Sequence, residues 1–213
     1  MDAGLGMPEK WAWKLGYCRV AGADEAGRGA LAGPLVAAAV ILPVDDHIEG
    51  LEDLNDSKLL MPSVRRELFR YILSSAEAWA FSCVPAADID RTGLQANNMA
   101  ALREAVISLR PAPEMVLVDY YQVSEIGIPQ WSLVRGDRTS RNIAAASILA
   151  KVIMDQLMWF WSLKYPQYGF ETNKGYGTER HVRALRDYGP APCHRQSFHG
   201  VLQMEMKLKE YYE

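Results

Sequence analysis

Acidic residues follow three short apolar segments, at positions where β-strands are expected to end. They are Asp24 and Glu25 after residues 17–23, Asp119 after residues 116–118, and Asp137 after residues 131–134. In an open α/β sheet, side chains that leave the strand ends converge on one edge and form sites. Carboxylates brought together repel one another and bind protons unless a divalent cation lies among them. The pattern therefore indicates a metal site with carboxylate ligands.

Oxygen-only ligands of this kind suit hard ions such as Mg²⁺ or Mn²⁺. Two such ions about 3.5–4 Å apart activate a water and stabilise the leaving oxygen of a phosphodiester. A single acidic residue at a strand end is more often a solvated turn residue or a helix cap. Asp119 fits that reading poorly, because the Val116–Val118 stretch before it is expected to be buried and would partly desolvate its carboxylate.

The neighbours Asp24 and Glu25 impose a condition on such a site. Successive side chains of a regular strand point to opposite faces of the sheet. The two carboxylates therefore share one site only if the strand ends or bulges there. Gly27 and Gly29, just beyond, favour such an irregularity.

The elements that must position these groups follow from hydrophobic periodicity and turn signals. The pattern predicts strands at 17–23, 35–42, 79–84, 115–118 and 131–134. It predicts helices at 62–78, 86–109 with a break near Gly93, 142–163, 178–188 and 198–211. This order indicates an α/β fold with a mixed sheet. Residues 1–16 are predicted to be a loosely held N-terminal arm whose Trp11 and Trp13 dock on the core. Residues 17–213 are predicted to be one domain.

The Gly27-Arg28-Gly29 segment lets the backbone approach a ligand closely, so that its amides and Arg28 can meet a phosphate or a sugar hydroxyl. An ordinary turn between two strands explains it as well. A third reading is the dinucleotide-binding fingerprint, since Ala32 completes Gly-x-Gly-x-x-Ala. That motif must open a helix, whereas residues 36–42 have the composition of a strand. The preceding carboxylates would also repel a pyrophosphate.

Charge is distributed unevenly along the chain, although the net charge is only −3. Residues 130–200 carry ten Lys or Arg against five Asp or Glu, a net charge of +5, and the remainder carries −8. A basic C-terminal third suits an anion-binding surface for nucleic acid, although solvated helix faces explain it equally well.

Other features of the composition indicate the compartment. Three widely spaced cysteines, Cys18, Cys83 and Cys193, fit a reducing cytoplasm better than a disulfide framework. Polar residues near position 9 argue against a signal peptide, and the longest apolar run, residues 30–43, is too short to cross a bilayer. We expect no membrane association, and a monomer is the default expectation.

The chain resembles bacterial ribonuclease HII, a type 2 ribonuclease H, in motifs that span about residues 17 to 200 in order. The most specific is Gly22-Ala-Asp-Glu-Ala-Gly-Arg-Gly-Ala-Leu-Ala-Gly-Pro34. The others are Leu54-Asn-Asp-Ser-Lys58, Val116-Leu-Val-Asp119, Arg135-Gly-Asp137, Ile143–Val152, Tyr165–Phe170, Lys174-Gly-Tyr-Gly-Thr178 and His194-Arg-Gln-Ser-Phe198.

This resemblance implies a ribonuclease H-like fold, a five-stranded mixed sheet flanked by helices with a small C-terminal helical region. It implies that the metal-binding and catalytic carboxylates are Asp24, Glu25, Asp119 and Asp137. It implies that Gly27, Arg28 and Gly29 read the ribonucleotide 2′-OH, which distinguishes RNA from DNA, and adjoining phosphates. Tyr176 is then expected to stack on the deoxyribose of the following nucleotide.

The chain departs from the family pattern in one place. After Asp119 the family shows Gly-Asn or a similar small pair, whereas this chain has Tyr120-Tyr121. Bulk beside a metal ligand could narrow the site or change its metal preference. Ser57 and Lys58 are explained about as well by a polar loop as by a phosphate contact. His181 and His194 are expected to be structural, since type 2 enzymes do not depend on the histidine that type 1 enzymes use.

The resulting hypothesis is an endonuclease dependent on Mg²⁺ or Mn²⁺. It would cut on the 5′ side of ribonucleotides in RNA/DNA hybrids and in duplex DNA, leave a 3′-hydroxyl and a 5′-phosphate, and remove misincorporated ribonucleotides and RNA primers. Its nucleophile would be a water whose pKa the cation lowers. Two alternatives are a nuclease or resolvase of the same fold without ribonucleotide specificity, and a nucleic-acid-binding module without catalysis.

Overall fold

The computed structural model describes residues 5–45, 48–51, 54 and 60–201. Its chain divides into two compact units, each described by itself. Unit 1 comprises the chain up to Ala26, Val36–Ser82 and Met99–Val152, and unit 2 comprises Gly27–Leu35, Cys83–Asn98 and the chain from Ile153 onward. Ser57 and Lys58 lie outside the described residues, as do residues 202–211 of the predicted last helix.

A five-stranded mixed sheet, as predicted, is the centre of unit 1. Its strands are β1 (Val20–Ala26), β2 (Leu35–Ile41), β3 (Ala78–Val84), β4 (Met115–Asp119) and β5 (Gln130–Leu133). The spatial order is β3-β2-β1-β4-β5. β1 pairs antiparallel with β2 and parallel with β4, and β4 pairs parallel with β5. Every residue of β2 is buried, as expected of a central strand with both faces covered.

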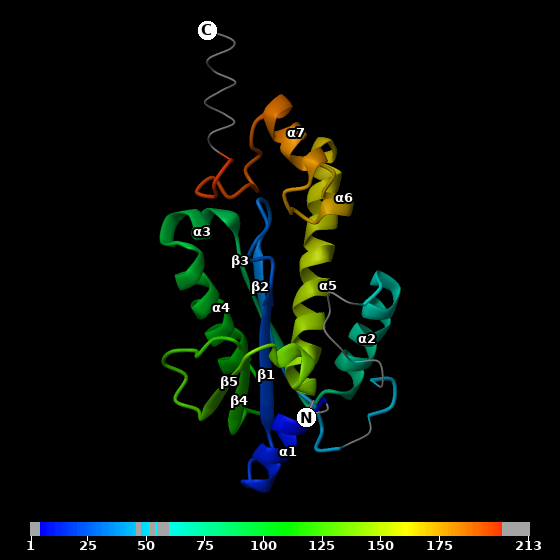
Figure 1. Ribbon diagram of the computed structural model, residues 1–213, viewed down its shortest axis with the longest axis vertical. Helices are drawn as coiled ribbons and strands as arrows, with labels where there is room; N and C mark the ends of the chain where they lie inside the picture. The colour runs from blue at the N-terminus through cyan, green and yellow to red at the C-terminus, as the bar shows by residue number, and fades with distance from the viewer. Residues whose placement is uncertain (1–4, 46–47, 52–53, 55–59, 202–213) are drawn as a thin grey trace. The chain divides into compact units, whose positions relative to one another are not determined.

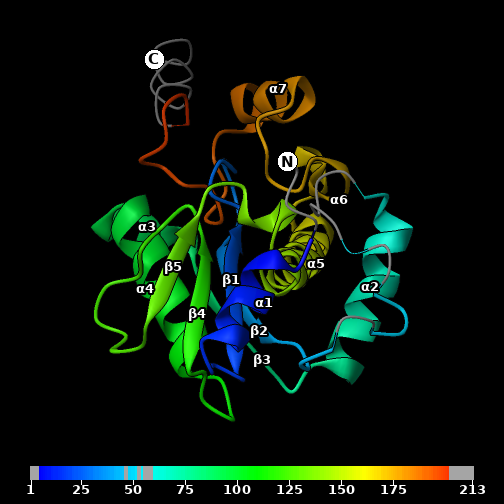
Figure 2. The same cartoon turned by 60° about the horizontal axis from the view of Figure 1, so that its bottom comes forward.

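Helices cover both faces of this sheet, as Figures 1 and 2 show. Helix α4 (Leu94–Ile107) lies on one side, and α5 (Arg141–Lys164) lies on the other together with α2 (Pro62–Ser75). Gly93 (φ 87°) separates α4 from α3 (Ala86–Thr92), at the break predicted from the sequence. By length and hydropathy α5 is able to cross a membrane. However, 61% of its most apolar window is buried in the protein, as in the core helix of a globular fold.

The start of α5 lies directly against β1. A Cβ atom at Gly22 would lie 2.1 Å from the backbone carbonyl carbon of Asn142, so only glycine fits there. The Asn142 amide group donates to Val20 O at 2.7 Å, and its oxygen accepts from Leu42 N at 3.3 Å. Asn142 thus ties the first turn of α5 to β1 and to the end of β2.

The N-terminal arm differs from the loose segment expected. Residues Met7–Lys14 form α1, whose Ala12 is fully buried. Trp13 packs against the core cluster that includes Ala12, as predicted, whereas Trp11 is 51% exposed and its docking stays a prediction. Glu9 fixes the helix in place, because its Oε1 accepts from the Ser140 hydroxyl and from Asn142 N.

Strand β1 begins and ends three residues later than its pattern predicts. The chain before it is bound to Glu114, whose carboxylate accepts from the amides of Cys18 and Arg19. The strand continues through Asp24 and Glu25 to Ala26, which pairs with Val36, so these acidic residues lie within the strand and not after it. Gly27, with φ 94°, ends it.

Unit 2 contains α3, the 3-10 turn η2 (Pro166–Tyr168), the short α6 (Phe170–Asn173) and α7 (Glu179–Tyr188). A second 3-10 turn, η1 (Gly136–Arg138), belongs to unit 1. Thr178, the first residue of the predicted helix, is the N-cap of α7 and accepts from His181 N. Residues 198–201 form a turn, so the predicted last helix does not begin at Phe198.

Candidate active site

Two of the predicted carboxylates occupy matching positions on adjacent parallel strands. β1 and β4 pair in a register that matches Ala23 with Val118, so the next pair in the same register is Asp24 with Asp119. Residues in matching positions on neighbouring strands point to the same face of the sheet. Like charges in such positions destabilise a sheet, so the pair has a cost to stability that another role must justify.

Asp24 is deeply buried, with 7% of its surface exposed. Its Oδ1 accepts from Glu25 N at 2.8 Å, and Ser147 of α5 is a side-chain hydrogen-bond partner. Burial raises the pKa of Asp24 well above its usual value, and the nearby charges of Glu25 and Asp119 raise it further. The fold thus holds a carboxyl group whose ionisation needs a compensating positive charge.

Asp119 is linked to the segment that carries Asp137. Its Oδ1 accepts from Gly136 N at 2.6 Å, and Gly136 opens the turn η1 that leads into α5. Asp137 is the next residue and is 7% exposed. This hydrogen bond brings the end of β4 and the backbone of η1 together.

The strand neither ends nor bulges at Asp24 and Glu25, as it would have to for both carboxylates to share one site. The regular pairing of β1 with β2 continues through Asp24, Glu25 and Ala26, without a bulge, so the pleat directs Asp24 and Glu25 to opposite faces. Within the described residues, no three Asp, Glu, His or Cys side chains are grouped so that they could hold a metal ion as they stand. Electrostatic interaction joins Asp24, Glu25 and Asp119, and the four-carboxylate ligand set stays a prediction.

The predicted substrate-reading residues all lie in unit 2. Gly27 requires glycine, because its φ is 94° and a Cβ atom there would lie 2.8 Å from Pro34 O. A Cβ at Gly29 would lie 3.9 Å from the Tyr176 ring, so this loop and Tyr176 are neighbours. The Arg28 guanidinium donates to Gln95 Oε1 through two nitrogens, each at 3.3 Å.

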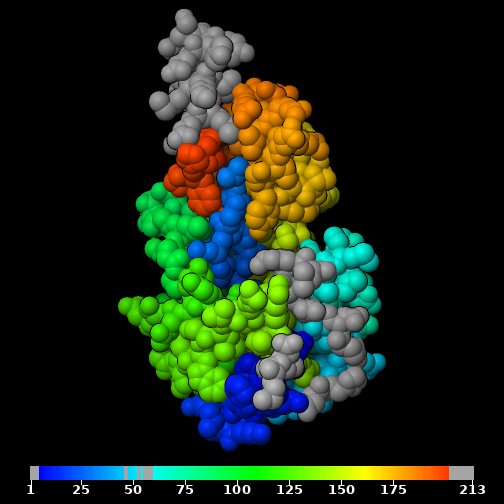
Figure 3. Space-filling view, in the orientation of Figure 1, coloured from blue at the N-terminus to red at the C-terminus, as the bar shows by residue number. Residues whose placement is uncertain are grey.

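The residues of the Gly-x-Gly-x-x-Ala pattern open no helix. Residues 27–34 form turns and bends that lead into β2, which excludes the dinucleotide-binding reading. Tyr120, where the sequence departs from the expected small pair, has φ 61° and is 65% exposed. Glycine adopts this left-handed conformation without strain, which explains why the family pattern has glycine where this chain has Tyr120. The chain around β5 forms part of the surface of unit 1 on the face drawn in Figure 3.

Sequence reasoning missed three residues that support these groups: Ser147 beside Asp24, Gln95 beside Arg28, and Arg195 beneath the glycine loop. Ser147 and Arg195 belong to motifs that the sequence marked, but residue type alone gave them no role. Gln95 carried no signal, because its contact depends on how the chain folds around Gly93.

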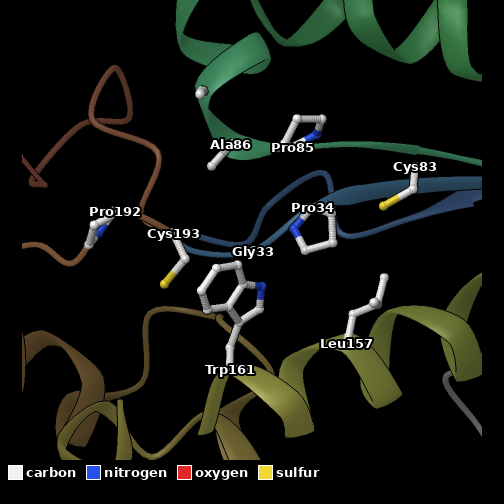
Figure 4. Close-up of a pocket in the computed structure, with 10 residues that line it drawn as sticks. Gly33, Pro34, Cys83, Pro85, Ala86, Leu157, Trp161, Pro192 and Cys193 are labelled. Carbon is white, nitrogen blue, oxygen red and sulfur yellow. The ribbon is translucent and has the colours of Figure 1, made fainter. Parts of the chain in front are cut away.

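An apolar pocket of about 330 Å³ lies in unit 2 between Trp161, Leu157, Pro85 and Cys193 (Figure 4). The residues that line it include none of the predicted site residues. Burial raises the pKa of the Cys193 thiol to about 12, so this thiol is neutral at physiological pH. An apolar pocket of this kind does not bind phosphate, and we do not assign the chemistry to it.

Comparison with known proteins gives consistent matches. The sequence model of the family described as ribonuclease HII matches residues 21–201. A ribonuclease HII of Pelotomaculum thermopropionicum is 49% identical over 186 residues, which cover 87% of this chain and 70% of that protein. A ribonuclease HII of Salinispora tropica is 46% identical over 200 residues, which cover 94% of this chain and 74% of that protein.

Solved structures agree with the sequence matches. The ribonuclease H2 of Pyrococcus horikoshii has a TM-score of 0.79 and 26% identity, with 90% of this chain and 99% of that chain covered. A complex of PCNA with ribonuclease HII from Archaeoglobus fulgidus contains a chain with a TM-score of 0.71 and 26% identity, covering 84% and 95%. Bst-RNase HIII in complex with Mn²⁺, at 22% identity and a TM-score of 0.70, supports the fold, with 93% and 73% covered.

Proposed function

This chain belongs to the ribonuclease HII family and is a type 2 ribonuclease H, and from that premise we propose that it cuts on the 5′ side of ribonucleotides. The substrates would be RNA/DNA hybrids and single ribonucleotides embedded in duplex DNA. Hydrolysis would leave a 3′-hydroxyl and a 5′-phosphate. The observation that carries the proposal is the buried Asp24 carboxylate in electrostatic contact with Asp119, the two residues that follow the matched pair Ala23 and Val118 on β1 and β4.

The residues fit a divalent cation by the chemistry of their donors. Asp24, Glu25, Asp119 and Asp137 offer only carboxylate oxygens, which are the ligands that Mg²⁺ and Mn²⁺ prefer. The raised pKa of Asp24 supports the fit, because a cation bound there would offset both its burial and the two neighbouring charges. Asp24 and Asp119 have the strongest support as ligands. Asp137 follows the Gly136 amide that binds Asp119, and Glu25 has electrostatic support alone.

Bound Mg²⁺ or Mn²⁺ would lower the pKa of water and stabilise the leaving oxygen of the phosphodiester. Hydrogen bonds within this chain orient the two carboxylates for that chemistry. Ser147 and the Glu25 amide orient the Asp24 carboxylate, and the Gly136 amide orients that of Asp119. Fixed orientation of this kind reduces the reorganisation needed when charge develops.

Substrate recognition is assigned to unit 2. Gly27, Arg28 and Gly29 would offer backbone amides and a guanidinium to the ribonucleotide 2′-OH and adjoining phosphates. Tyr176, which is 37% exposed, would stack on the sugar of the following deoxynucleotide. The close approach of Gly29 to the Tyr176 ring supports one continuous reading surface for an RNA–DNA junction.

The proposed setting is the cytoplasm, where the enzyme would remove misincorporated ribonucleotides and RNA primers. Support comes from the three cysteines of the chain, which are all free thiols. The basic stretch 130–200 would contact the duplex backbone, so binding should weaken as salt rises. We propose a monomer that acts without a membrane.

A cleavage assay tests this function. A DNA duplex that carries one ribonucleotide and an otherwise identical all-DNA duplex are incubated with the protein and Mg²⁺ or Mn²⁺. We expect cleavage of the first duplex only, at the bond 5′ of the ribonucleotide, with EDTA abolishing it. Equal cleavage of both duplexes would indicate a nuclease without ribonucleotide specificity. Binding without metal-dependent cleavage would indicate a module without catalysis, and either result refutes the proposal.

A further inference from the structure

Arg195 is a buried cation held by carbonyl groups. Its side chain is fully buried and donates to Arg28 O at 2.9 Å, Gly33 O at 3.1 Å and Pro34 O at 3.0 Å. A buried guanidinium is costly unless its donors are satisfied. Here the partners are the backbone oxygens of the loop that contains Gly27, Arg28 and Gly29. Only the planar fork of arginine presents donors in the directions needed to hold three carbonyls at once.

The preceding residue, His194, supports Tyr176 through a chain of hydrogen bonds. His194 Nδ1 lies 2.9 Å from Ala191 N and 3.1 Å from Ala191 O. Because Ala191 O already accepts from His194 N, we assign Nδ1 as the acceptor of the Ala191 N–H and place the proton of His194 on Nε2. His194 Nε2 then donates to His181 Nε2, 3.0 Å away. His181 must therefore carry its proton on Nδ1, which donates to Tyr176 O at 2.9 Å. Both rings are buried, and this arrangement requires both to be neutral.

Backbone hydrogen bonds join these segments into one structure. Ala32 and His194 form an antiparallel bridge, Arg195 N donates to Leu31 O, and Gly33 N donates to Cys193 O. Figure 4 shows Cys193 beside Gly33 and Pro34. On the other side, the amides of Leu31 and Ala32 both donate to Gly175 O, next to Tyr176. Residues 31–34 thus connect the 193–195 segment with the Tyr176 segment.

We propose that His194 and Arg195 are positioning residues for ribonucleotide recognition, Arg195 through the Gly27–Gly29 loop and His194 through Tyr176. The proposal rests on the proposed function of that loop and of Tyr176. Neither residue touches substrate. Each sets the place of a group that does, so that the two halves of the reading surface are fixed by adjacent residues of one segment.

The first test replaces Arg195 with Lys, which keeps the charge and loses the fork. Cleavage of the single-ribonucleotide duplex is measured at a temperature where circular dichroism shows each variant folded. We expect KM to rise about 10-fold, since charge-assisted hydrogen bonds to the loop are lost. The matched control is Arg65→Lys, because Arg65 is also buried and donates to a carbonyl, Leu60 O, but lies in unit 1. Its KM should stay within about 2-fold of the wild-type value.

A double-mutant cycle separates positioning from general stability. If Arg195 acts through the loop, Arg195→Lys should cost less in an Arg28→Ala background than in the wild type, because the two changes damage one unit. For His194 we compare Phe, which removes both hydrogen bonds, with Gln, which can still accept and donate. His194→Phe should raise KM, and His194→Gln should restore at least part of the loss.

Several results would overturn the inference. They are an unchanged KM in Arg195→Lys, a multiplicative effect of Arg195→Lys and Arg28→Ala in the cycle, and equal KM values for His194→Phe and His194→Gln. Failure of the proposed function looks different, because the wild type itself would then not distinguish the ribonucleotide duplex from the DNA duplex. A wild type that discriminates, together with an insensitive Arg195→Lys, rejects the positioning role alone.

Discussion

At the scale of single residues, the main feature of the site is that the ionisable Asp24 is buried next to other carboxylates. Asp24 and Asp119 follow the matched pair Ala23 and Val118 on β1 and β4. Burial is the largest cause that raises the pKa of Asp24, and the charges of Glu25 and Asp119 raise it further. Carboxyl groups that are costly to ionise in the folded protein are concentrated at functional sites, which favours a functional role for Asp24. The residue types and their order after apolar stretches predicted Asp24, Glu25, Asp119 and Asp137 as a group, and that ligand set stays a prediction.

Replacing Asp24 with Asn tests whether this buried carboxylate serves catalysis at a cost to stability. We expect turnover to fall by at least about 100-fold, since a loss of about 2.7 kcal/mol of transition-state stabilisation corresponds to that factor. The melting temperature should stay the same or rise, because the amide removes a buried charge and its oxygen can still accept from Glu25 N. Activity and thermal unfolding are measured on the same preparation. A variant that keeps wild-type turnover would remove Asp24 from the catalytic set.

The strained backbone at Tyr120 gives a second prediction. Its φ of 61° favours glycine, and its side chain is mostly exposed. Tyr120→Gly should raise the free energy of unfolding by roughly 0.5–1 kcal/mol, after the greater backbone freedom of unfolded glycine is subtracted. Denaturant unfolding measures the change, with Tyr121→Gly as the control that has no positive φ to relieve. A destabilised Tyr120→Gly would show that the ring contributes packing that its exposure does not reveal.

At the scale of elements, hydrophobic periodicity predicted the strands and long helices well, because β2 and α5 are buried along most of their length. It failed where a single side chain decides the structure. The hydrogen bonds of Glu114 to Cys18 N and Arg19 N hold the chain before β1, and no local pattern encodes a partner some 95 residues away. Helix α1 was missed for the same reason, since it depends on Glu9 binding to the start of α5.

The link between α1 and α5 can be tested at Glu9. Glu9→Ala should lower the free energy of unfolding by about 2 kcal/mol, because Ser140 and Asn142 N both lose an acceptor. Glu9→Gln should cost less than about 1 kcal/mol, since its oxygen still accepts. Denaturant titration distinguishes the two. Equal effects of Ala and Gln would mean that the charge, and not the hydrogen bonds, fixes α1.

Glu9 also predicts a pH dependence. Burial raises its pKa above 4.5, so the folded state holds a proton that the unfolded state releases first. The stabilisation that comes from this retained proton is therefore complete below pH 4.5 and is lost as pH rises through the folded-state pKa of Glu9, whereas the hydrogen bonds that Glu9 accepts do not require the proton. Glu9→Gln should lack this component. The difference between the two unfolding curves from pH 4 upward measures it, and parallel curves would contradict the burial of an ionisable Glu9.

At the scale of the whole molecule, the proposed chemistry and the proposed recognition are assigned to different compact units. The four carboxylates lie in unit 1, and the glycine loop with Tyr176 lies in unit 2. The motifs predicted both sets by type and order. They did not predict the support of unit 2, because the roles of Arg195 and of the histidine pair depend on which carbonyls each meets in the fold.

The histidine pair predicts how unit 2 responds to acid. Burial lowers the pKa of His194 from 6.5 to about 4, assisted by His181, whose own pKa burial also lowers. The neighbouring Tyr168 hydroxyl is neutral as well, because burial raises its pKa. The unfolded state therefore takes up protons first, and stability is lost as pH falls from 6.5 toward 4. The loss from His194 is on the order of 3 kcal/mol.

Unfolding free energy measured between pH 7 and pH 4 checks this prediction. His194→Gln should flatten the curve in that window. Equal slopes for the wild type and His194→Gln between pH 7 and pH 4 would show that the pair is accessible to protons in the folded protein.

The central claim is that the carboxylates of β1, β4 and η1 hold the cation that the reaction needs. Anomalous diffraction from crystals soaked in Mn²⁺, at a concentration that supports full activity, tests it most directly. We expect an anomalous peak in contact with both Asp24 and Asp119, joined by Asp137 or Glu25, and its loss in Asp24→Asn. A peak held by other residues, or no peak at these carboxylates in an active preparation, would contradict it.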